Sequence, residues 1–543
     1  MPELTDEEKY QLNLAYKHPD YGTKTRNARR SYALVRNQEK PERIYNNVLL
    51  TPVKNLPFLL NDKNIMPEAS MVSRQPKLGT TRQSGLRLSI DRIQPEVSKK
   101  WLYGATLTPT TLCIEVENME EAYSDNIVKA TEKCTILMVR NMCEACNIDT
   151  SIFTTGNLKH RRDKIEVLHQ EYDDRTGVWD CRSDIGKEVT VARYAAIQAT
   201  TFEKHSELVI NHFNNPSAPI QRGVLKFGTN LDMPPNESWK AQYDELEKLP
   251  VPFRVIHKDS NMLNHIGKRA GMNELQLYMK IPHVKTPCHQ ENNSMASINL
   301  NIGPGDCEWY GVAYEFWPMV ADMCGERLID FMNGSYWPDV TDLKKKGIPV
   351  HHFIQEAGDI VYVSSGCVHW VRSLGYCNNV AWNVGPMTNR QLNISLRSND
   401  YNIDAVKVSV IGANAVPVLE HCPLYRNHSG KKFGYTIAHV LKKSSQQVHK
   451  TFGKLKKAGI TPRVRSELEE PLSDNCNECL SEAYFFKFKF TNGTIKCSSC
   501  IAESEIGRCE VYAECENDKE MVQFCTEFTN RAYDRPALKR KHS

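Results

Sequence analysis

The chain of 543 residues contains no long apolar run and no apparent internal repeat. A membrane-spanning helix needs about 18 apolar residues in succession, so the sequence predicts no integral membrane protein. Residues 1–8 are polar and acidic, which is unlike a secretory signal. We therefore expect the 18 cysteines to be reduced thiols or metal ligands rather than disulfides.

Positive charge is concentrated at the start of the chain. Residues 1–100 carry 18 Lys and Arg against 11 Asp and Glu, or +7, so the net charge of +4 leaves −3 for residues 101–543. A basic arm can contact nucleic acid or act as a nuclear import signal, although a solvated tail would carry the same charge. The slightly acidic remainder favours a basic peptide over bare DNA as a partner.

Composition and pattern divide the chain into six regions. Hydrophobic residues make up 40% and charged residues 25%, which is typical of a globular protein. Short β-like runs bounded by Gly and Pro, such as residues 275–281 and 296–302, predict an antiparallel barrel or sandwich. The predicted regions are a basic, largely disordered arm (1–100), a mixed α/β part (101–223), a mostly β core (224–400), a helical linker (401–470), a cysteine-rich domain (471–530) and a basic tail (531–543).

One stretch of the β core carries candidate metal ligands. His289 and Glu291 stand two positions apart, so in an extended chain their side chains project to the same side. Further along, a Gly-Asp turn, a buried strand and a Ser-Ser-Gly turn precede His369, and a hairpin closing the barrel would bring this residue beside the first two. Two histidines and one carboxylate are typical of non-haem Fe(II) oxygenases. The ligands alone also fit a zinc hydrolase.

Neighbouring polar residues predict a pocket for a dicarboxylate. An Fe(II) oxygenase of this type usually uses 2-oxoglutarate, whose far carboxylate needs a cation and a hydroxyl. Lys280 and Thr286 are candidates for these roles, although Lys280 could also be an ordinary surface lysine. The alternating polar positions of two predicted strands favour a ligand cavity inside the barrel over an exposed polar face: Ser297, Asn299 and Asn301 in one, Asn379 and Asn383 in the other.

The cysteine-rich domain contains two Cys-x-x-Cys pairs separated by seventeen residues. Four thiolates with this spacing predict a closed, tetrahedral structural Zn²⁺ site formed by Cys476, Cys479, Cys497 and Cys500. Residues 483–494 between the pairs predict a hairpin. Three further cysteines, Cys509, Cys515 and Cys525, lack this spacing and are expected to be core residues.

Several runs closely resemble the Jumonji C (JmjC) histone lysine demethylases that act on lysine 27 of histone H3. The clearest begins His289-Gln290-Glu291-Asn292-Asn293, and the resemblance covers roughly residues 100–530. One departure is Cys288, where a glycine is expected. The other runs that carry the resemblance are residues 297–309, 334–338, 353–355, 366–371 and 377–386.

The resemblance implies a double-stranded β-helix, a cupin-like jelly-roll barrel, within residues 224–400, surrounded by helices. It implies Fe(II) held by His289, Glu291 and His369, with O₂ and 2-oxoglutarate as co-substrates. By the same resemblance Tyr278 lies in the methyl-lysine pocket, and the zinc domain helps to hold the histone tail. The implied 2-oxoglutarate contacts are Lys280, Thr286, Ser297, Asn299 and Asn379.

The activity implied is removal of methyl groups from a di- or trimethylated histone H3 lysine in the nucleus, in association with chromatin complexes. Two alternatives stay open on the sequence. One is a protein hydroxylase using the same metal centre, and the other is a chromatin scaffold with little catalytic activity.

Overall fold

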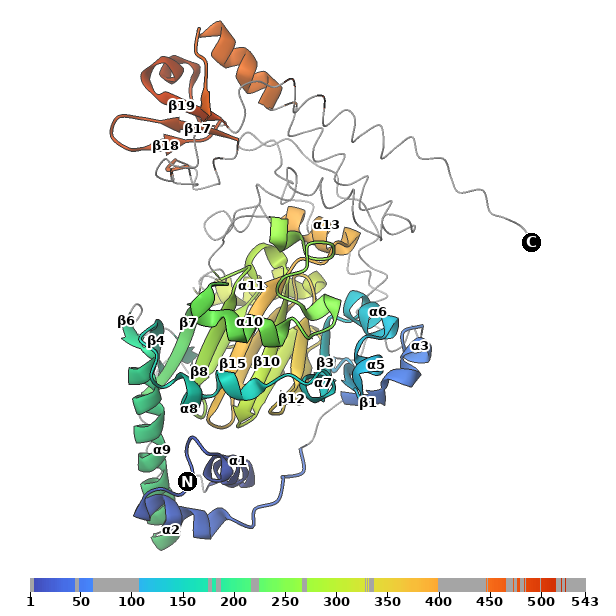
Figure 1. The fold of residues 1–543 in the computed structure, drawn as a ribbon, viewed down its shortest axis with the longest axis vertical. Helices are drawn as coiled ribbons and strands as arrows, with labels where there is room; N and C mark the ends of the chain where they lie inside the picture. Colours follow the sequence, from blue (N-terminus) through green and yellow to red (C-terminus); the bar gives the residue numbers. More distant parts are fainter. Residues whose placement is uncertain are drawn as a thin grey trace, which may run out of the picture.

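The computed structural model (Figure 1) describes most of the barrel and its surroundings. Predictions that fall on residues 62–106, 401–445 and 524–543 lie outside the described residues, as does Cys479. Within the described part of the chain, no helix is long and apolar enough to cross a lipid bilayer. The described residues are 4–43, 48–61, 107–173, 178–181, 187–215, 224–265, 271–327, 336–398, 448–464, 476–478, 485–498 and 500–513, with a few single positions.

Two β-sheets form the barrel. The larger sheet has the order β1-β2-β3-β13-β10-β15-β8-β7-β4-β5, with β6 beside β4, and the smaller has the order β12-β11-β14-β9. The strands are β1 (Val48–Pro52), β2 (Thr111–Glu115), β3 (Ile136–Arg140), β4 (Lys164–Asp173), β5 (Val178–Asp180), β6 (Lys187–Thr190), β7 (Leu225–Met233), β8 (Leu275–Lys280), β9 (Lys285–His289), β10 (Ala296–Pro304), β11 (Cys307–Val312), β12 (His351–Gln355), β13 (Ile360–Val363), β14 (Val368–Ser373) and β15 (Cys377–Val384).

Side-chain alternation along β10 explains how the larger sheet is packed. Ile298 and Leu300 are fully buried in a core shared with three helices that cover the outer face of this sheet, namely α5 (Met119–Ala122), α6 (Asp125–Lys133) and α10 (Lys240–Leu246). Ser297 and Asn299 therefore face the barrel interior. The smaller sheet closes the barrel, since Trp309 and Phe353 pack in one cluster with Val361 of the larger sheet. The predicted antiparallel barrel with a polar interior face is confirmed.

Helices surround the larger sheet (Figure 1), and the long helix α9 runs beside its β4–β7 edge. The predicted helical spacing from Val191 is correct, and the helix continues to Asn214. The helices are α1 (Asp6–Lys17), α2 (Arg26–Val35), α3 (Leu56–Leu59), α5 (Met119–Ala122), α6 (Asp125–Lys133), α7 (Met142–Ala145), α8 (Thr155–Leu158), α9 (Val191–Asn214), α10 (Lys240–Leu246), α11 (Trp317–Glu326), α12 (Val340–Lys345) and α13 (Asn389–Ser398).

The N-terminal region differs from the prediction of a largely disordered arm. Residues 4–43 form α1 and α2, and β1 adds a parallel strand to the larger sheet. Helix α1 begins with a capping box, in which Thr5 Oγ1 accepts from the Glu8 amide and Glu8 Oε2 accepts from the Thr5 amide. Apolar residues such as Leu12 and Tyr16 pack against α9 and β7. This region contains few apolar residues, so its sequence suggested disorder. The few that are present lie on one face, and burying that face is enough to hold the helices against the barrel.

A separate small sheet lies in the C-terminal part of the chain. Its order is β16-β19-β17-β18, and residues 448–457 form a helix whose apolar side chains share its core. The hairpin of β17 and β18 lies between the two cysteine pairs, as the sequence predicts. The strands are β16 (Arg463–Val464), β17 (Phe486–Lys489), β18 (Ile495–Lys496) and β19 (Glu510–Ala513).

Candidate functional site

Two strands of the smaller sheet bring the predicted triad together. His289 ends β9 and faces His369 of β14 directly across the antiparallel pair, with ring centroids 4.3 Å apart. Glu291 follows β9, and its Oε1 lies 4.0 Å from His289 Nε2 and 3.5 Å from His369 Nε2. The three ligand atoms all lie within 4.8 Å of one another. Two imidazoles and a carboxylate thus converge on one point.

The backbone orients both imidazole rings. His289 Nδ1 lies 2.7 Å from the carbonyl oxygen of Pro287, and His369 Nδ1 lies 3.3 Å from that of Cys367. A carbonyl oxygen only accepts, so in each neutral ring Nδ1 carries the hydrogen and Nε2 keeps its lone pair. Both lone pairs therefore belong to the nitrogens nearest Glu291. Burial and the neighbouring His289 lower the pKa of His369 to about 4, which keeps this ring neutral near pH 7.

Residues of the larger sheet hold the carboxylate of Glu291. Asn383 Nδ2 donates to Glu291 Oε2 at 3.0 Å, which leaves Oε1 directed at the histidines. Burial raises the pKa of Glu291, but His369, His289 and the hydrogen bonds from Asn383 and Ser297 outweigh it and hold the pKa below its usual value. A carboxylate beside two imidazole nitrogens is a suitable ligand set for a divalent transition metal.

A second polar cluster lies inside the barrel, between the larger sheet and Cys307 of the smaller sheet. Lys280 is 2% exposed, and its Nζ lies 3.9 Å from the Sγ of Cys307. Asn379 Nδ2 donates to Asn299 Oδ1 at 2.9 Å, and Asn379 Oδ1 lies 3.5 Å from the same sulfur. The alternative that Lys280 is a surface lysine is excluded. A buried ammonium among amides and thiols offers a strong site for a carboxylate.

The Cys307 thiol itself is activated by its surroundings. The Cys377 thiol lies 3.6 Å away, and its hydrogen bond, followed by the charge of Lys280, lowers the pKa of Cys307 to about 7 against the effect of burial. The sequence pattern gave no reason to place these two cysteines beside Lys280, because they belong to β11 and β15. The pairing of β15 with β8 sets Cys377 opposite Lys280, and Cys307 of the smaller sheet meets Cys377 from the facing sheet.

The remaining predicted site residues are placed as follows. Thr286 lies on β9, opposite Val371 of β14, and no contact of its side chain with the Lys280 cluster is observed. The Tyr278 hydroxyl donates to Gln276 Oε1 at 2.9 Å, and its ring stacks on Phe227. Asn301 differs from the expectation of a cavity-lining residue, because its side chain is fully buried and donates to the carbonyl of Gly305.

Three cysteines of the C-terminal domain form a second cluster. The sulfurs of Cys476, Cys497 and Cys500 lie within 4.8 Å of one another. Cys497 directly follows β18. The Asn477 side chain, next to Cys476, accepts from the Ile495 amide at 2.6 Å and so connects the first Cys-x-x-Cys segment to the second. Three thiols converging in this way are a candidate metal site.

Some contributors to the site were not identified from the sequence. Trp309, predicted only as a core residue, stacks on His369 with ring planes 12° apart. Gln355 donates to the Asn299 backbone carbonyl at 2.9 Å and accepts from Trp309 Nε1 at 2.8 Å, so it links the two sheets. The sequence does not predict that Gln355 links the two sheets, because its hydrogen-bond partners Trp309 and Asn299 are distant in sequence.

A double-sheet barrel with two histidines and a carboxylate at adjacent strands is typical of the cupin-like fold of non-haem oxygenases. Residues 276–384 match the family model described as a JmjC domain, hydroxylase. The chain thus contains a JmjC domain, and the fold class and the resemblance predicted from the sequence are confirmed. Such a hydroxylase domain implies a metal and 2-oxoglutarate.

Two curated proteins extend the similarity beyond the barrel. The chain is 32% identical over 507 residues to lysine-specific demethylase 6B of Homo sapiens, covering 85% of this chain and 30% of that protein. It is 32% identical over 333 residues to lysine-specific demethylase jmjd-3.1 of Caenorhabditis elegans, covering 55% of this chain and 30% of that protein. The chain therefore spans about 30% of the length of these relatives.

Proposed function

We propose that this protein is an Fe(II)- and 2-oxoglutarate-dependent dioxygenase that removes methyl groups from a histone H3 lysine, with di- or trimethylated lysine 27 as the preferred site. The convergence of His289, Glu291 and His369, with both Nε2 atoms near the same carboxylate oxygen, is the observation that carries the proposal. The similarity to two lysine-specific demethylases supports the substrate class.

The residues present fit Fe(II) better than a purely structural ion. His289 and Glu291 retain side-chain exposures of 30% and 21%, so the triad is not sealed, whereas a structural zinc site would use four closed ligands. When bound, the iron supplies oxidation of a C–H bond with O₂ and 2-oxoglutarate. Nearby, Asn383 fixes the carboxylate of Glu291, and the two backbone carbonyls fix the rings.

The other side chains are proposed to bind and orient 2-oxoglutarate and the methylated lysine. The Lys280 ammonium is proposed to hold the far carboxylate of 2-oxoglutarate, with Thr286, Ser297, Asn299 and Asn379 as further contacts. Tyr278 is proposed to line the methyl-lysine pocket. Because its hydroxyl already donates to Gln276, its oxygen lone pairs are available to a methylammonium group.

The test of this proposal is turnover of methylated histone H3 peptides by the full chain. With Fe(II) and 2-oxoglutarate, we expect one formaldehyde per methyl group removed, and a loss of 14 mass units from the peptide on mass spectrometry. A stable gain of 16 mass units without formaldehyde would instead identify a protein hydroxylase. If neither product forms while the peptide still binds fully, the result would support a scaffold.

Lys280 allows a more specific prediction. Lys280→Met keeps the length and apolar stem of the side chain but removes the charge, so 2-oxoglutarate loses a charge-assisted hydrogen bond in a buried site. We expect at least about tenfold weaker binding of 2-oxoglutarate, since about 1.4 kcal/mol corresponds to a factor of ten. Titration calorimetry with the metal-loaded protein measures this directly, and Lys159→Met on the surface is the control.

We further propose that Cys476, Cys479, Cys497 and Cys500 bind a structural Zn²⁺ ion. Three of the four sulfurs already converge, and the Cys-x-x-Cys spacing supplies the fourth. By resemblance, this domain helps to hold the histone tail. Residues 401–470 as a linker, 471–530 as the zinc domain and 531–543 as a basic tail remain proposed boundaries.

Removal of the proposed zinc has a predictable result. A strong chelator, or Cys497→Ser, is expected to unfold the small sheet of β16–β19, because metal binding supplies much of the folding free energy of such small domains. The barrel has its own core and is expected to keep its melting transition. Zinc content by mass spectrometry and two-step thermal melts measure this, and an unchanged lower transition would contradict the assignment.

The cellular setting is proposed from the histone substrate. A methylated histone tail as substrate implies a nuclear location and association with chromatin complexes. Contact of the basic N-terminal region with DNA is also proposed, and competition of histone turnover with duplex DNA tests it.

A further inference from the structure

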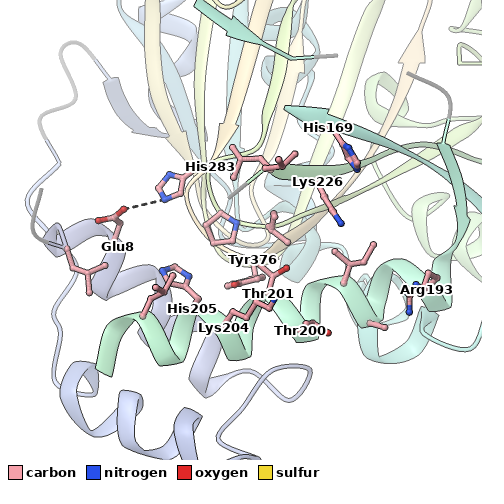
Figure 2. Close-up of a pocket in the computed structure, with 18 residues that line it drawn as sticks. Glu8, His169, Arg193, Thr200, Thr201, Lys204, His205, Lys226, His283 and Tyr376 are labelled. Carbon is pink, nitrogen blue, oxygen red and sulfur yellow. Dashed lines mark ion pairs between the residues drawn. The ribbon is translucent and has the colours of Figure 1, made fainter. Parts of the chain in front are cut away.

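An elongated groove lies on the outside of the barrel, away from the triad. Its volume is about 740 Å³, and it is bounded by α9, by β4 and β7, and by the turn between β8 and β9 (Figure 2). The beginning of α1 closes one end through Leu4 and Glu8. None of the residues proposed for iron, 2-oxoglutarate or methyl-lysine lines it.

One face of α9 forms the long wall of the groove. The residues that line it recur every three or four positions, which places them on the same side of the helix. From Arg193 to Leu208 this face extends for about 22 Å at 1.5 Å per residue. Ala196 and Thr200 line this wall between Arg193 and Lys204, and both are small, so the helix leaves room beside the sheet there.

The floor of the groove is apolar. Ile281, Pro282, Leu225 and Tyr376 line it, and all four are buried. The hydroxyl of Tyr376 has no hydrogen-bond partner among the residues that the structure describes, although the atom is buried and the side chain is 1% exposed. An unpartnered buried hydroxyl is costly.

The rim of the groove is positively charged. Arg193, Lys204 and Lys226 line it, and no ion pair of any of the three with a described residue is observed. Among the described residues that line the groove, the one acidic residue is Glu8. It is already engaged, because it accepts from the Thr5 amide at 2.9 Å and lies 3.3 Å from His283 Nε2. Arg193 and Lys204 are eleven residues apart on α9, or about 16 Å.

We propose that this groove binds an extended acidic peptide segment of a partner protein. At about 3.3 Å per residue, a strand of six or seven residues spans the 22 Å face of α9. Acidic side chains along the segment would pair with Arg193, Lys226 and Lys204, while apolar side chains between them would cover the floor. A compact anion cannot reach cations about 16 Å apart, and a nucleic-acid backbone leaves an apolar floor unused.

The probe is a fluorescein-labelled seven-residue peptide of alternating glutamate and leucine, titrated into the full chain without iron or 2-oxoglutarate. Fluorescence anisotropy is expected to show saturable binding that weakens as salt rises. The same peptide with glutamine in place of glutamate is expected to bind at least tenfold more weakly. Equal binding of the two peptides would overturn the proposal.

Variants locate the binding. The double variant Lys204→Glu, Lys226→Glu is expected to weaken peptide binding at least tenfold, whereas the control Lys129→Glu, Lys159→Glu changes the net charge equally on exposed residues outside the groove. Thr200→Trp fills the groove from α9 without changing charge and is expected to block binding. The proposal fails if the two double variants behave alike, or if duplex DNA displaces the peptide and binds more tightly. Because no turnover is measured, the result is independent of the proposed demethylase activity.

Discussion

Replacing Glu291 by Gln is expected to abolish metal binding and peptide demethylation while leaving the barrel folded. The substitution keeps the size of the side chain, and the amide oxygen can still accept from Asn383. However, it removes the one negative charge among the three converging ligands, so both histidines face a neutral group. Removing only the hydrogen-bond partner of a metal ligand costs about 10–100-fold, so loss of the ligand charge is expected to cost more than about 100-fold.

Asn383→Ala provides the matched comparison. It leaves all three ligands in place and removes only the donor to Glu291 Oε2, so we expect a loss of about 10–100-fold in metal affinity. Anaerobic titration with Fe²⁺ measures affinity, and formaldehyde release measures turnover. If Glu291→Gln binds iron as tightly as the unmodified chain, the triad is not the metal site. An unchanged melting temperature in both variants would show that the losses are local.

The triad could be predicted because its signal is local. His289 and Glu291 stand two residues apart, with His289 at the end of β9 and Glu291 just after it. The predicted hairpin is wrong, because β13 and β14 lie in different sheets, but the turn between these strands does bring His369 opposite His289 across the pair of β9 and β14. The strand alternation of β10 is equally local, since apolar residues occupy every second position against the helices. For the same reason, the hairpin between the cysteine pairs was predicted correctly.

Contacts between distant segments left no such signal. The proximity of Cys307 and Cys377 to Lys280 depends on strand order, which one sequence does not reveal. The order of the N-terminal region was missed for a related reason. A solvated tail was one of the expectations for its charged residues, but several of them pair with charges on the barrel.

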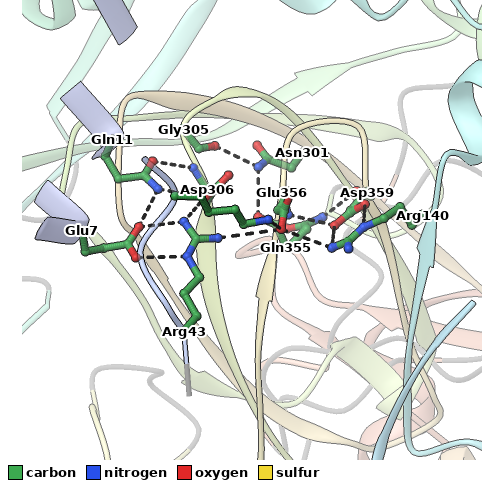
Figure 3. Close-up of polar contacts among 11 residues, drawn as sticks. Glu7, Gln11, Arg43, Arg140, Asn301, Gly305, Asp306, Gln355, Glu356 and Asp359 are labelled. Carbon is green, nitrogen blue, oxygen red and sulfur yellow. Dashed lines mark hydrogen bonds and ion pairs between the residues drawn. The ribbon is translucent and has the colours of Figure 1, made fainter. Parts of the chain in front are cut away.

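Arg43 is the centre of that pairing (Figure 3). Its guanidinium forms two hydrogen bonds with Glu7, at 2.7 and 3.0 Å, and pairs with Asp306 at the turn between β10 and β11. The same carboxylate accepts from Gln11 of α1 at 2.8 Å. A neighbouring pair, Arg140 with Asp359, continues the network along the barrel. Arg43 and Asp306 are 5% and 4% exposed, so this attachment of the N-terminal region is desolvated.

Arg43→Ala is therefore expected to destabilise the folded chain by about 3–5 kcal/mol, the cost of leaving a buried charge without its partner. Lys40→Ala removes a neighbouring, largely exposed cation and is expected to cost no more than about 1 kcal/mol. Adding Asp306→Asn to Arg43→Ala removes the stranded charge, so the double variant should lose much less than the sum of the two single losses. Urea denaturation of the unmodified chain, the three single variants and the double variant measures these losses.

The pH dependence distinguishes a stranded charge from simple loss of packing. Burial already raises the pKa of Asp306, and Arg43 opposes that rise. Without Arg43 the folded-state pKa rises further, so between the unfolded and folded pKa values the folded chain holds a proton that the unfolded chain has lost. Stability then falls as pH rises through this window. The deficit of Arg43→Ala should therefore be smaller at pH 5 than at pH 8, whereas a deficit independent of pH would indicate that Arg43 acts through packing alone.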